Sequence, residues 1–297
     1  MKILVTGSNG LLGQKLTHLL QTEKSISFIA TARGKSVLPI TNGVFESLDI
    51  TDAAEVDRVI STIKPDVIIN AAAMTQVDQC ETERELCWTA NVTSVENLIR
   101  ACTKNNVHLV HVSTDFIFDG TYGPLDETAK PNPINYYGES KLAAEERMIN
   151  SKISWSILRT VLVYGITEDM SRSNIVLWVK NSLELGKTIQ VVNDQWRTPT
   201  LAEDLAMGCY LAAKTKATGI YNISGKDFIT PYDIAIATAD FFKLDKTQIK
   251  ITDSTQFKQP AQRPPKTGFI IDKARKELGY EPHSFQEGLK VLAEQIH

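Results

Sequence analysis

The sequence has few of the features that mark metal, membrane and nucleic-acid proteins. Its 297 residues include four cysteines and five histidines. The cysteines form no C-x-x-C pair and accompany no histidine cluster, so we expect no metal site. No apolar run approaches the roughly 20 residues of a membrane span. The net charge of −3 lacks the basic excess of nucleic-acid-binding proteins, so we expect neither a membrane nor a nucleic-acid partner.

The N-terminal seven residues are apolar and run directly into a glycine turn, without the cleavage site of a signal peptide. The unpaired cysteines suit a reducing compartment, so we expect a cytoplasmic protein. A hydrophobic fraction of 42% and a charged fraction of 23% are ordinary for a globular chain. The length suits one large α/β domain, or one such domain with a smaller lobe.

Strands and helices alternate through the first half of the chain, and this alternation predicts a Rossmann-type, doubly wound parallel sheet. Such sheets bind ligands beyond the carboxyl ends of their strands. Gly7, Arg33, Asp49, Ala71 and Ser113 all follow predicted strand ends, which indicates one site along that edge. The predicted strands cover residues 2–6, 28–32, 44–48, 66–70, 107–112 and 155–160.

A glycine loop follows the first strand and leads into a helical pattern. The G-x-x-G-x-x-G spacing lets the backbone approach a pyrophosphate at a helix N-terminus. An ordinary turn between strand and helix is the alternative, but the position after the first strand favours dinucleotide binding. The loop residues expected to face the cofactor are Gly7, Asn9, Gly10, Leu11, Leu12 and Gly13.

Two further strand ends refine the cofactor prediction. Arg33 lies twenty residues after Gly13, where an acidic residue suits NAD and an arginine accommodates the 2′-phosphate of NADP. Arg33 therefore favours NADP(H), with NAD(H) as the alternative because basic residues are common at strand ends. Small residues after the fourth strand would let a loop lie against a flat cofactor, or would allow tight helix packing. They are Ala71, Ala72 and Ala73.

Tyr137 and Lys141 stand four residues apart, so in a helix they share a face. A free phenol, with a pKa near ~10, is a poor acid at neutral pH. A neighbouring ammonium would lower that pKa, and the phenol could then exchange a proton with an alcohol or ketone oxygen. A surface helix is the alternative for the pair alone. Its position after a strand that ends at Ser113 and Thr114 favours catalysis.

The character of the chain changes after about residue 165, where shorter elements and irregular stretches alternate. We predict a dinucleotide-binding domain over residues 1–165, with segments around 190–215 re-entering it. Residues 166–297 are predicted to form mainly a smaller α/β substrate-binding lobe. Thr200 with Glu203, and Ser284 with Glu287, predict capping boxes that open helices.

These motifs together resemble the extended short-chain dehydrogenase/reductases, and most closely the dTDP-4-dehydrorhamnose reductases. The resemblance implies that Tyr137 protonates the substrate carbonyl as hydride arrives from the nicotinamide, and that Lys141 holds the nicotinamide ribose. It also implies that Thr114 hydrogen-bonds that carbonyl and that Asp115 lies against the substrate. The segments that carry the resemblance are 7–13, 70–78, 113–120, 131–141, 159–164 and 192–200.

The resemblance also implies that Asp49 and Ile50 face the adenine, and that Arg263 binds the diphosphate of a nucleotide sugar. An arginine fork suits phosphate, although a structural ion pair is an equal alternative for Arg263. The expected catalytic residues are thus Tyr137, Lys141 and Thr114.

Three places in the sequence refine the resemblance. Phe116 stands where sugar-nucleotide dehydratases carry a glutamate, which counts against water elimination. Val161 and Leu162 occupy a stretch where rhamnose-type reductases usually place a tryptophan against the sugar, so the identity of the sugar stays open. Arg197 and Thr198 replace residues that are commonly small.

The leading hypothesis is an NADPH-dependent reductase of a nucleotide-activated 4-keto-6-deoxy sugar, as in dTDP-rhamnose biosynthesis. A sugar-nucleotide epimerase would use the same tyrosine and lysine. A non-catalytic, NADP-binding regulatory subunit is the third possibility. Helices near 82–104 and 135–150 correspond to the usual dimer surface of the superfamily, so a homodimer is expected.

Overall fold

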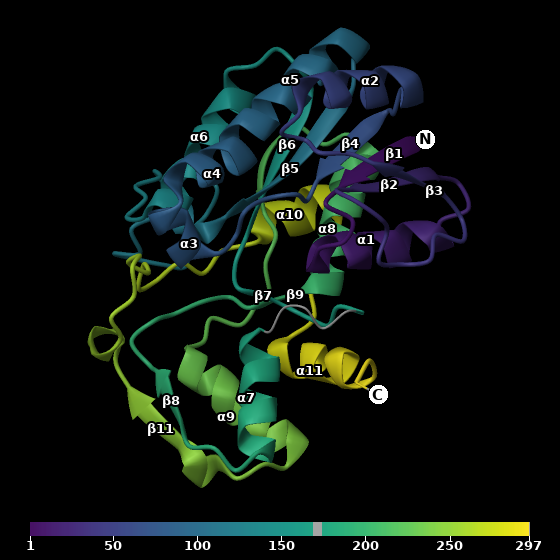
Figure 1. The fold of residues 1–297 in the computed structure, drawn as a ribbon. Helices are drawn as coiled ribbons and strands as arrows, with labels where there is room; N and C mark the ends of the chain where they lie inside the picture. The colour runs from purple at the N-terminus through teal and green to yellow at the C-terminus, as the bar shows by residue number, and fades with distance from the viewer. Residues whose placement is uncertain (169–173, 297) are drawn as a thin grey trace.

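A parallel sheet forms the centre of the computed structural model, which describes residues 1–168 and 174–296 (Figure 1). Its strand order is β10-β6-β5-β4-β1-β2-β3, and every pairing between these strands is parallel. The predicted doubly wound α/β fold is confirmed. The strands of the sheet are β1 (Lys2–Thr6), β2 (Ser27–Ala32), β3 (Val44–Ser47), β4 (Val67–Asn70), β5 (His108–Thr114), β6 (Trp155–Thr160) and β10 (Gly219–Asn222).

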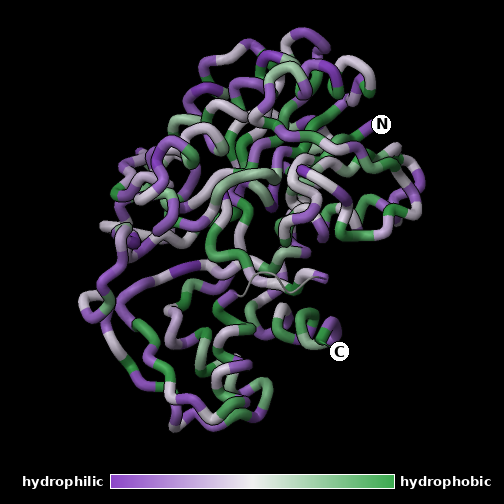
Figure 2. Tube along the Cα trace, viewed as in Figure 1, coloured by the Kyte–Doolittle hydropathy of each residue, from purple (hydrophilic) through white to green (hydrophobic). Residues whose placement is uncertain are grey.

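Helices cover both faces of this sheet. The helices form two groups, named below, and the apolar side chains of each sheet face pack against one of these groups. The core strands appear as mostly hydrophobic segments in Figure 2, as expected for strands buried on both sides. The first group is α1 (Leu11–Thr22), α8 (Ala202–Thr215) and α10 (Asp272–Leu278). The second is α2 (Ala53–Ile63), α5 (Ser94–Asn105) and α6 (Tyr136–Ile149).

A smaller lobe lies beyond one edge of the sheet and has its own apolar clusters (Figure 1). Two short parallel pairs, β8 with β11 and β7 with β9, belong to this part of the chain. Its elements are β7 (Val163–Tyr164), α7 (Ile175–Glu184), β8 (Ile189–Val192), β9 (Thr200–Leu201), α9 (Pro231–Phe242), β11 (Ile249–Thr252) and α11 (Phe285–Ala293), with 3₁₀ turns at Lys246–Gln248 and Ser254–Gln256.

Three details of the structure differ from the predictions made from the sequence. The sheet gains a seventh strand, β10, which was not predicted. The long helix expected over residues 82–104 is divided into α3 (Val77–Thr82), α4 (Arg84–Trp88), a π-helical turn at Thr89–Thr93, and α5. The capping box predicted at Thr200 is wrong, because its hydroxyl donates to the Val161 carbonyl at 2.7 Å and the N-cap of α8 is Leu201.

The other predicted capping box is confirmed. Ser284 accepts from the Glu287 amide, and the Glu287 carboxylate accepts from the Ser284 amide, so α11 begins where expected. Across the residues the structure describes, no helix is long and apolar enough to cross a membrane. Because the central strands are parallel, their carboxyl ends form one edge, which faces the smaller lobe (Figure 1).

Candidate active site

The glycine loop joins β1 to α1 in a shape that excludes side chains. Gly7 has a φ of +67°, and a Cβ atom there would lie 2.8 Å from the Ala72 backbone. A Cβ atom on Gly13 would lie 2.1 Å from the Gly7 carbonyl oxygen. Gly10 begins α1 without a side-chain cap, so the first amides of the helix point into the loop. The sequence reading of this turn thus has a steric basis.

This loop fits a dinucleotide. Within residues 1–168 and 174–296, the buried Ser8 hydroxyl of the loop and the buried Ser113 hydroxyl at the end of β5 have no hydrogen-bond partner. Unpaired buried polar atoms are uncommon and need an explanation. A phosphate at the uncapped helix N-terminus would suit the loop and its hydroxyl. The donors present match a dinucleotide cofactor.

The other predicted cofactor residues lie along the same edge. Arg33 is exposed just after β2. The Asn9 side chain donates to the Lys35 carbonyl at 2.9 Å and accepts from the Val37 amide at 3.1 Å, so it orders the loop that follows Arg33. The Asp49 carboxylate accepts from the Thr51 amide and hydroxyl at the start of α2. The remaining predicted residues of this edge are Ile50, which is buried, and Ala71, Ala72 and Ala73, which are partly buried.

Tyr137 lies in the first turn of α6, which Asn135 caps by accepting from the Gly138 amide at 2.8 Å. Its ring is buried against Phe116, at a centroid distance of 5.8 Å. Burial raises the pKa of the phenol, the hydrogen bond with Thr114 lowers it, and the charge of Asp115 raises it. The net direction is upward, so the phenol stays protonated at neutral pH. The structure places Thr114 against Tyr137, as a shared site requires.

Lys141 lies on the same helix, but its ammonium contacts other groups. Nζ donates to the Val112 carbonyl at 2.7 Å and lies 3.2 Å from His111 Nε2. Burial lowers the pKa of Lys141 to about 8, against the opposing effect of Glu145. The expected lowering of the Tyr137 pKa by Lys141 is absent from the leading influences on that phenol. Burial is therefore the dominant effect on both groups.

His111 connects Lys141 to β4 and β1. Asn70 Nδ2 donates to His111 Nδ1 at 3.0 Å, and Asn70 Oδ1 accepts from the Thr6 hydroxyl at 2.6 Å. Since Nδ1 accepts, a neutral imidazole carries its proton on Nε2 and donates to Lys141 as an amine. Turning the Asn70 amide over reverses the tautomer, and Nε2 then accepts from the ammonium. The charge of Lys141 is thereby linked to the orientation of Asn70.

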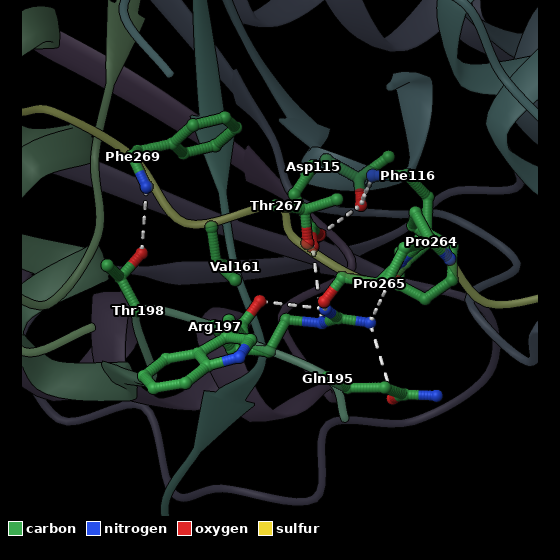
Figure 3. A network of polar contacts seen from close by, with 12 residues as sticks. Asp115, Phe116, Val161, Gln195, Arg197, Thr198, Pro264, Pro265, Thr267 and Phe269 are labelled. Atoms are coloured by element: carbon green, nitrogen blue, oxygen red, sulfur yellow. Dashed lines mark hydrogen bonds and ion pairs between the residues drawn. The ribbon is translucent and has the colours of Figure 1, made fainter. Parts of the chain in front are cut away.

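Asp115 lies on the other side of Tyr137 and is fully buried. Its Oδ1 accepts from the Thr114 hydroxyl at 3.1 Å, and its Oδ2 accepts from the Thr267 hydroxyl. Arg197 Nε lies 3.8 Å from Oδ2 (Figure 3). The predicted contact of Asp115 with a substrate stays a prediction, because protein groups surround this carboxylate here.

Arg263 forms a two-pronged ion pair with Asp78, at 2.6 and 2.7 Å. Arg263 therefore forms a structural ion pair, which was the alternative to diphosphate binding. Arg263 also lines a groove of about 500 Å³ between the lobe and residues 254–263. Polar and aromatic side chains share this groove. They are Asn174, Trp178, Gln190, Gln195, Ser254, Phe257 and Gln259.

The sequence reading assigned no role to His111 or Arg197. His111 stands between the apolar residues Val110 and Val112 of a buried strand, which is the signal that could have marked it. Arg197 was noted solely as a departure, and its partners are far away in sequence. In the part of the chain that the structure describes, no three side chains of the His, Cys, Asp or Glu types are placed to hold a metal ion.

Comparisons with known proteins were made for the whole chain. It is 31% identical over 303 residues to the dTDP-4-dehydrorhamnose reductase of Aggregatibacter actinomycetemcomitans, covering 98% of each chain. It is 32% identical over 258 residues to methionine adenosyltransferase 2 subunit beta of Xenopus laevis, covering 85% of this chain and 75% of that protein. The crystal structure of a Bacillus anthracis dTDP-4-dehydrorhamnose reductase in complex with NADP superposes with a TM-score of 0.87, at 27% identity and 99% coverage of each chain.

The parallel sheet, the glycine loop and the Tyr137–Lys141 helix define the short-chain dehydrogenase/reductase class. The sequence profile of the RmlD substrate binding domain matches residues 1–297. The chain belongs to the RmlD substrate binding domain family, and the resemblance stated from its motifs is confirmed.

Proposed function

We propose that this protein is an NADPH-dependent reductase of a nucleotide-activated 4-keto-6-deoxy sugar. The observation that carries the proposal is that α6 holds the Tyr137 ring against Phe116 and the Lys141 ammonium against Val112, so both side chains lie at the carboxyl end of β5. This pair lies on the sheet edge that also holds the glycine loop. Relatives of similar length named dTDP-4-dehydrorhamnose reductase, one of them complexed with NADP, support it.

NADPH, when bound, supplies a hydride to the substrate carbonyl carbon. Tyr137 supplies the proton to the carbonyl oxygen, since burial keeps its phenol protonated at neutral pH. Thr114 orients that phenol and lies within hydrogen-bonding reach of the same oxygen. The loop residues around Gly7, Gly10 and Gly13 would hold the pyrophosphate, and Arg33 the 2′-phosphate, with NAD(H) as the alternative cofactor.

Lys141 is protonated below a pKa of about 8, and its ammonium is the group that we expect to hold the nicotinamide ribose. After Tyr137 has given up its proton, the phenol takes up a proton from solvent, and this completes the cycle. The Val112 carbonyl and His111 hold Lys141 in place for this role.

The groove beside Arg263 is the proposed site of the nucleotide part of the substrate. Trp178 and Phe257, both partly exposed, offer faces on which a base could stack. The Arg263 guanidinium could exchange Asp78 for a diphosphate, which is the better partner for an arginine fork. The proposal includes a dinucleotide-binding domain over residues 1–165, with segments around 190–215, and a substrate-binding lobe formed mainly by residues 166–297.

The direct test is a panel of nucleotide-linked 4-keto-6-deoxy sugars, with dTDP, UDP and GDP as carriers. Incubation with NADPH should lower the absorbance of the reduced nicotinamide for at least one of them. A matched set of 4-hydroxy sugars serves as the control and should leave the absorbance unchanged. If every ketone is silent although NADPH binds, the proposed reaction is wrong.

A binding role is the second candidate, because subunits of methionine adenosyltransferase are among the similar proteins. Such a protein would bind NADP and a partner enzyme without reducing a substrate. The hydrogen-bonded Tyr137 and Thr114 and the buried Lys141 favour catalysis over this role. NADPH binding combined with silence on the whole sugar panel would favour the binding role instead. An epimerase would turn over sugars without net NADPH consumption.

The same proposal includes a homodimer in the cytoplasm. Leu86, Trp88 and Ile149 are exposed apolar side chains on α4 and α6, the helices expected at the dimer surface. The four cysteines are free, which suits a reducing compartment. Light scattering should give twice the 33.0 kDa chain mass, and a Trp88→Glu variant should shift that mass to the monomer.

A further inference from the structure

Arg197 is a buried cation with an unusual set of partners. Its Nη1 donates to the Trp196 carbonyl at 2.8 Å and to the Pro265 carbonyl at 3.2 Å. Its Nη2 donates to the Pro264 carbonyl at 2.7 Å and to Gln195 Oε1 at 3.4 Å. Carbonyls satisfy most of its hydrogen-bond donors but carry no full negative charge. The compensating charge comes from Asp115, beside Nε (Figure 3).

Asp115 depends on this cation in turn. A buried carboxylate without a nearby cation takes up a proton, since desolvation disfavours its charge. Burial raises the pKa of Asp115, while Arg197 is the largest influence in the opposite direction. The other groups facing the carboxylate are the hydroxyls of Thr114 and Thr267, and Tyr137, on which the Asp115 charge acts. The pKa of Asp115 is still raised overall by burial, and the guanidinium is the main group that favours its ionised form.

The charge of Asp115 decides the direction of the hydrogen bonds at Thr114. A threonine hydroxyl has one proton to donate. While Asp115 is ionised, Thr114 donates to Oδ1 at 3.1 Å, and its oxygen accepts from the Phe116 amide at 3.2 Å. The hydroxyl then has no second proton to donate to Tyr137. A protonated Asp115 would donate to Thr114 and reverse this order.

We propose that Arg197 is a positioning residue: its guanidinium keeps Asp115 ionised, and Asp115 then directs the Thr114 hydroxyl away from Tyr137. The Thr114 proton is thereby committed to Asp115 before substrate arrives. The effect on turnover rests on the proposed reductase function, whereas the Arg197–Asp115 coupling does not. Arg197 also joins Gln195 of the substrate groove to this network.

A purely structural reading of Arg197 is the competing explanation. Its guanidinium holds residues 264–265 against residues 195–197, where Trp196 and Lys266 pair as an isolated bridge. That role needs the hydrogen-bonding fork, whereas the proposed role needs the positive charge. Arg197→Lys keeps the charge and loses most of the fork. Arg197→Met keeps the volume of the stem and loses both.

The first experiment measures kcat/KM against pH for the wild type, R197M, R197K, D115N and R197M/D115N. An opposite charge nearby shifts a carboxyl pKa by about one to three units, so R197M should move the acid limb to higher pH by about that amount. R197K should keep the wild-type limb. R197M should cause no shift in the D115N background. An unshifted R197M profile, or an R197K shift equal to that of R197M, would overturn the proposal.

The second experiment needs no substrate, so its failure is separable from failure of the reductase function. A carboxyl whose folded pKa lies above its unfolded value loses stability as pH rises through that folded pKa. The free energy of unfolding should therefore fall more steeply between pH ~4 and pH ~7 in R197M than in the wild type. D115N should remove this difference. Equal slopes in R197M and wild type would contradict the coupling even if sugars are reduced.

Folding of the variants supplies a further check. If R197M fails to fold at neutral pH, R197M/D115N should fold, because no buried charge is left unpaired. Recovery of the folded double variant, measured by circular dichroism, supports the charge role. Failure of both variants, with R197K also unfolded, would show that the fork matters and would overturn the proposal.

Discussion

Two charged side chains are buried beside Tyr137, and the protein stabilises them by different means. Lys141 has neutral partners, the Val112 carbonyl and His111, and its nearest acidic influence is Glu145. Asp115 has a cation, Arg197, together with two hydroxyl donors. Burial thus lowers the pKa of Lys141 to about 8, while Arg197 opposes the upward shift at Asp115.

This difference separates a group that can change charge from one that is kept charged. A lysine with a pKa near 8 can exchange its proton within the physiological range. A paired carboxylate fixes the hydrogen bonds around it. Tyr137 shares helix α6 with Lys141, and the charge of Asp115 acts on its phenol. The following predictions test each side, beginning with the phenol.

Tyr137→Phe should have the largest effect. Loss of the proton donor should lower turnover by about 10²–10⁴-fold, because general acid catalysis by the phenol is then removed. NADPH affinity, measured by fluorescence titration, should be unchanged. Tyr136→Phe, at the neighbouring position on α6, is the matched control and should keep wild-type turnover. Full activity in Tyr137→Phe would refute the assigned acid.

Lys141→Met should change the pH dependence of stability. The folded pKa of Lys141 is about 8, below its ordinary value of 10.5, so its burial costs stability below the folded pKa. That cost should be relieved as pH rises from about 8 to about 10.5, by about 3 kcal/mol. Urea unfolding should show this rise in the wild type and not in the variant. If the free energy of unfolding of the wild type does not change over this range, burial does not lower the pKa of Lys141 as described.

His111→Leu should have a smaller effect on stability. The Asn70 amide would lose its partner on the imidazole, which costs about 1–3 kcal/mol for a buried donor. His111→Gln, which can restore a hydrogen bond, should recover part of that loss. Chemical unfolding at neutral pH measures both. Equal stability of His111→Leu and wild type would show that the hydrogen bonds linking Thr6, Asn70, His111 and Lys141 contribute nothing to the free energy of unfolding.

Thr114→Val should have the smallest effect of the four. Loss of one hydroxyl contact to Tyr137 should lower kcat by about tenfold, the cost of a typical hydrogen bond. Thr114→Ser keeps the hydroxyl and should stay close to wild type. The comparison of the two in steady-state kinetics separates the hydroxyl from the methyl group. A Thr114→Ser variant as slow as Thr114→Val would show that packing alone matters.

The sequence revealed the parts of the site whose partners are close along the chain. The glycine loop, the strand ends and the Tyr137–Lys141 spacing are local patterns, and the doubly wound fold that they predicted is confirmed. The roles of the individual site residues stay predictions. The capping box predicted at Thr200 was wrong because the Thr200 hydroxyl donates to the carbonyl of Val161, which is distant in sequence, instead of capping the nearby helix.

The sequence did not predict the contacts between residues that are far apart along the chain. Arg197 meets Pro264 across 67 residues, and Arg263 meets Asp78 across 185 residues. Nothing at either position marks its partner, since a buried arginine and an exposed one look alike in sequence. Strand β10 was missed for a similar reason, because its four residues become a strand by pairing with β6. These features depend on packing rather than on local propensity.

The central claim is that Tyr137 gives a proton to a ketone that is reduced at the expense of NADPH. The most direct measurement is the stoichiometry of the reaction with a nucleotide-linked 4-keto-6-deoxy sugar, followed by chromatography and NADPH absorbance together. We expect one NADPH oxidised for each ketone converted to an alcohol. Conversion of sugar without NADPH consumption, or NADPH binding without any conversion, would contradict it.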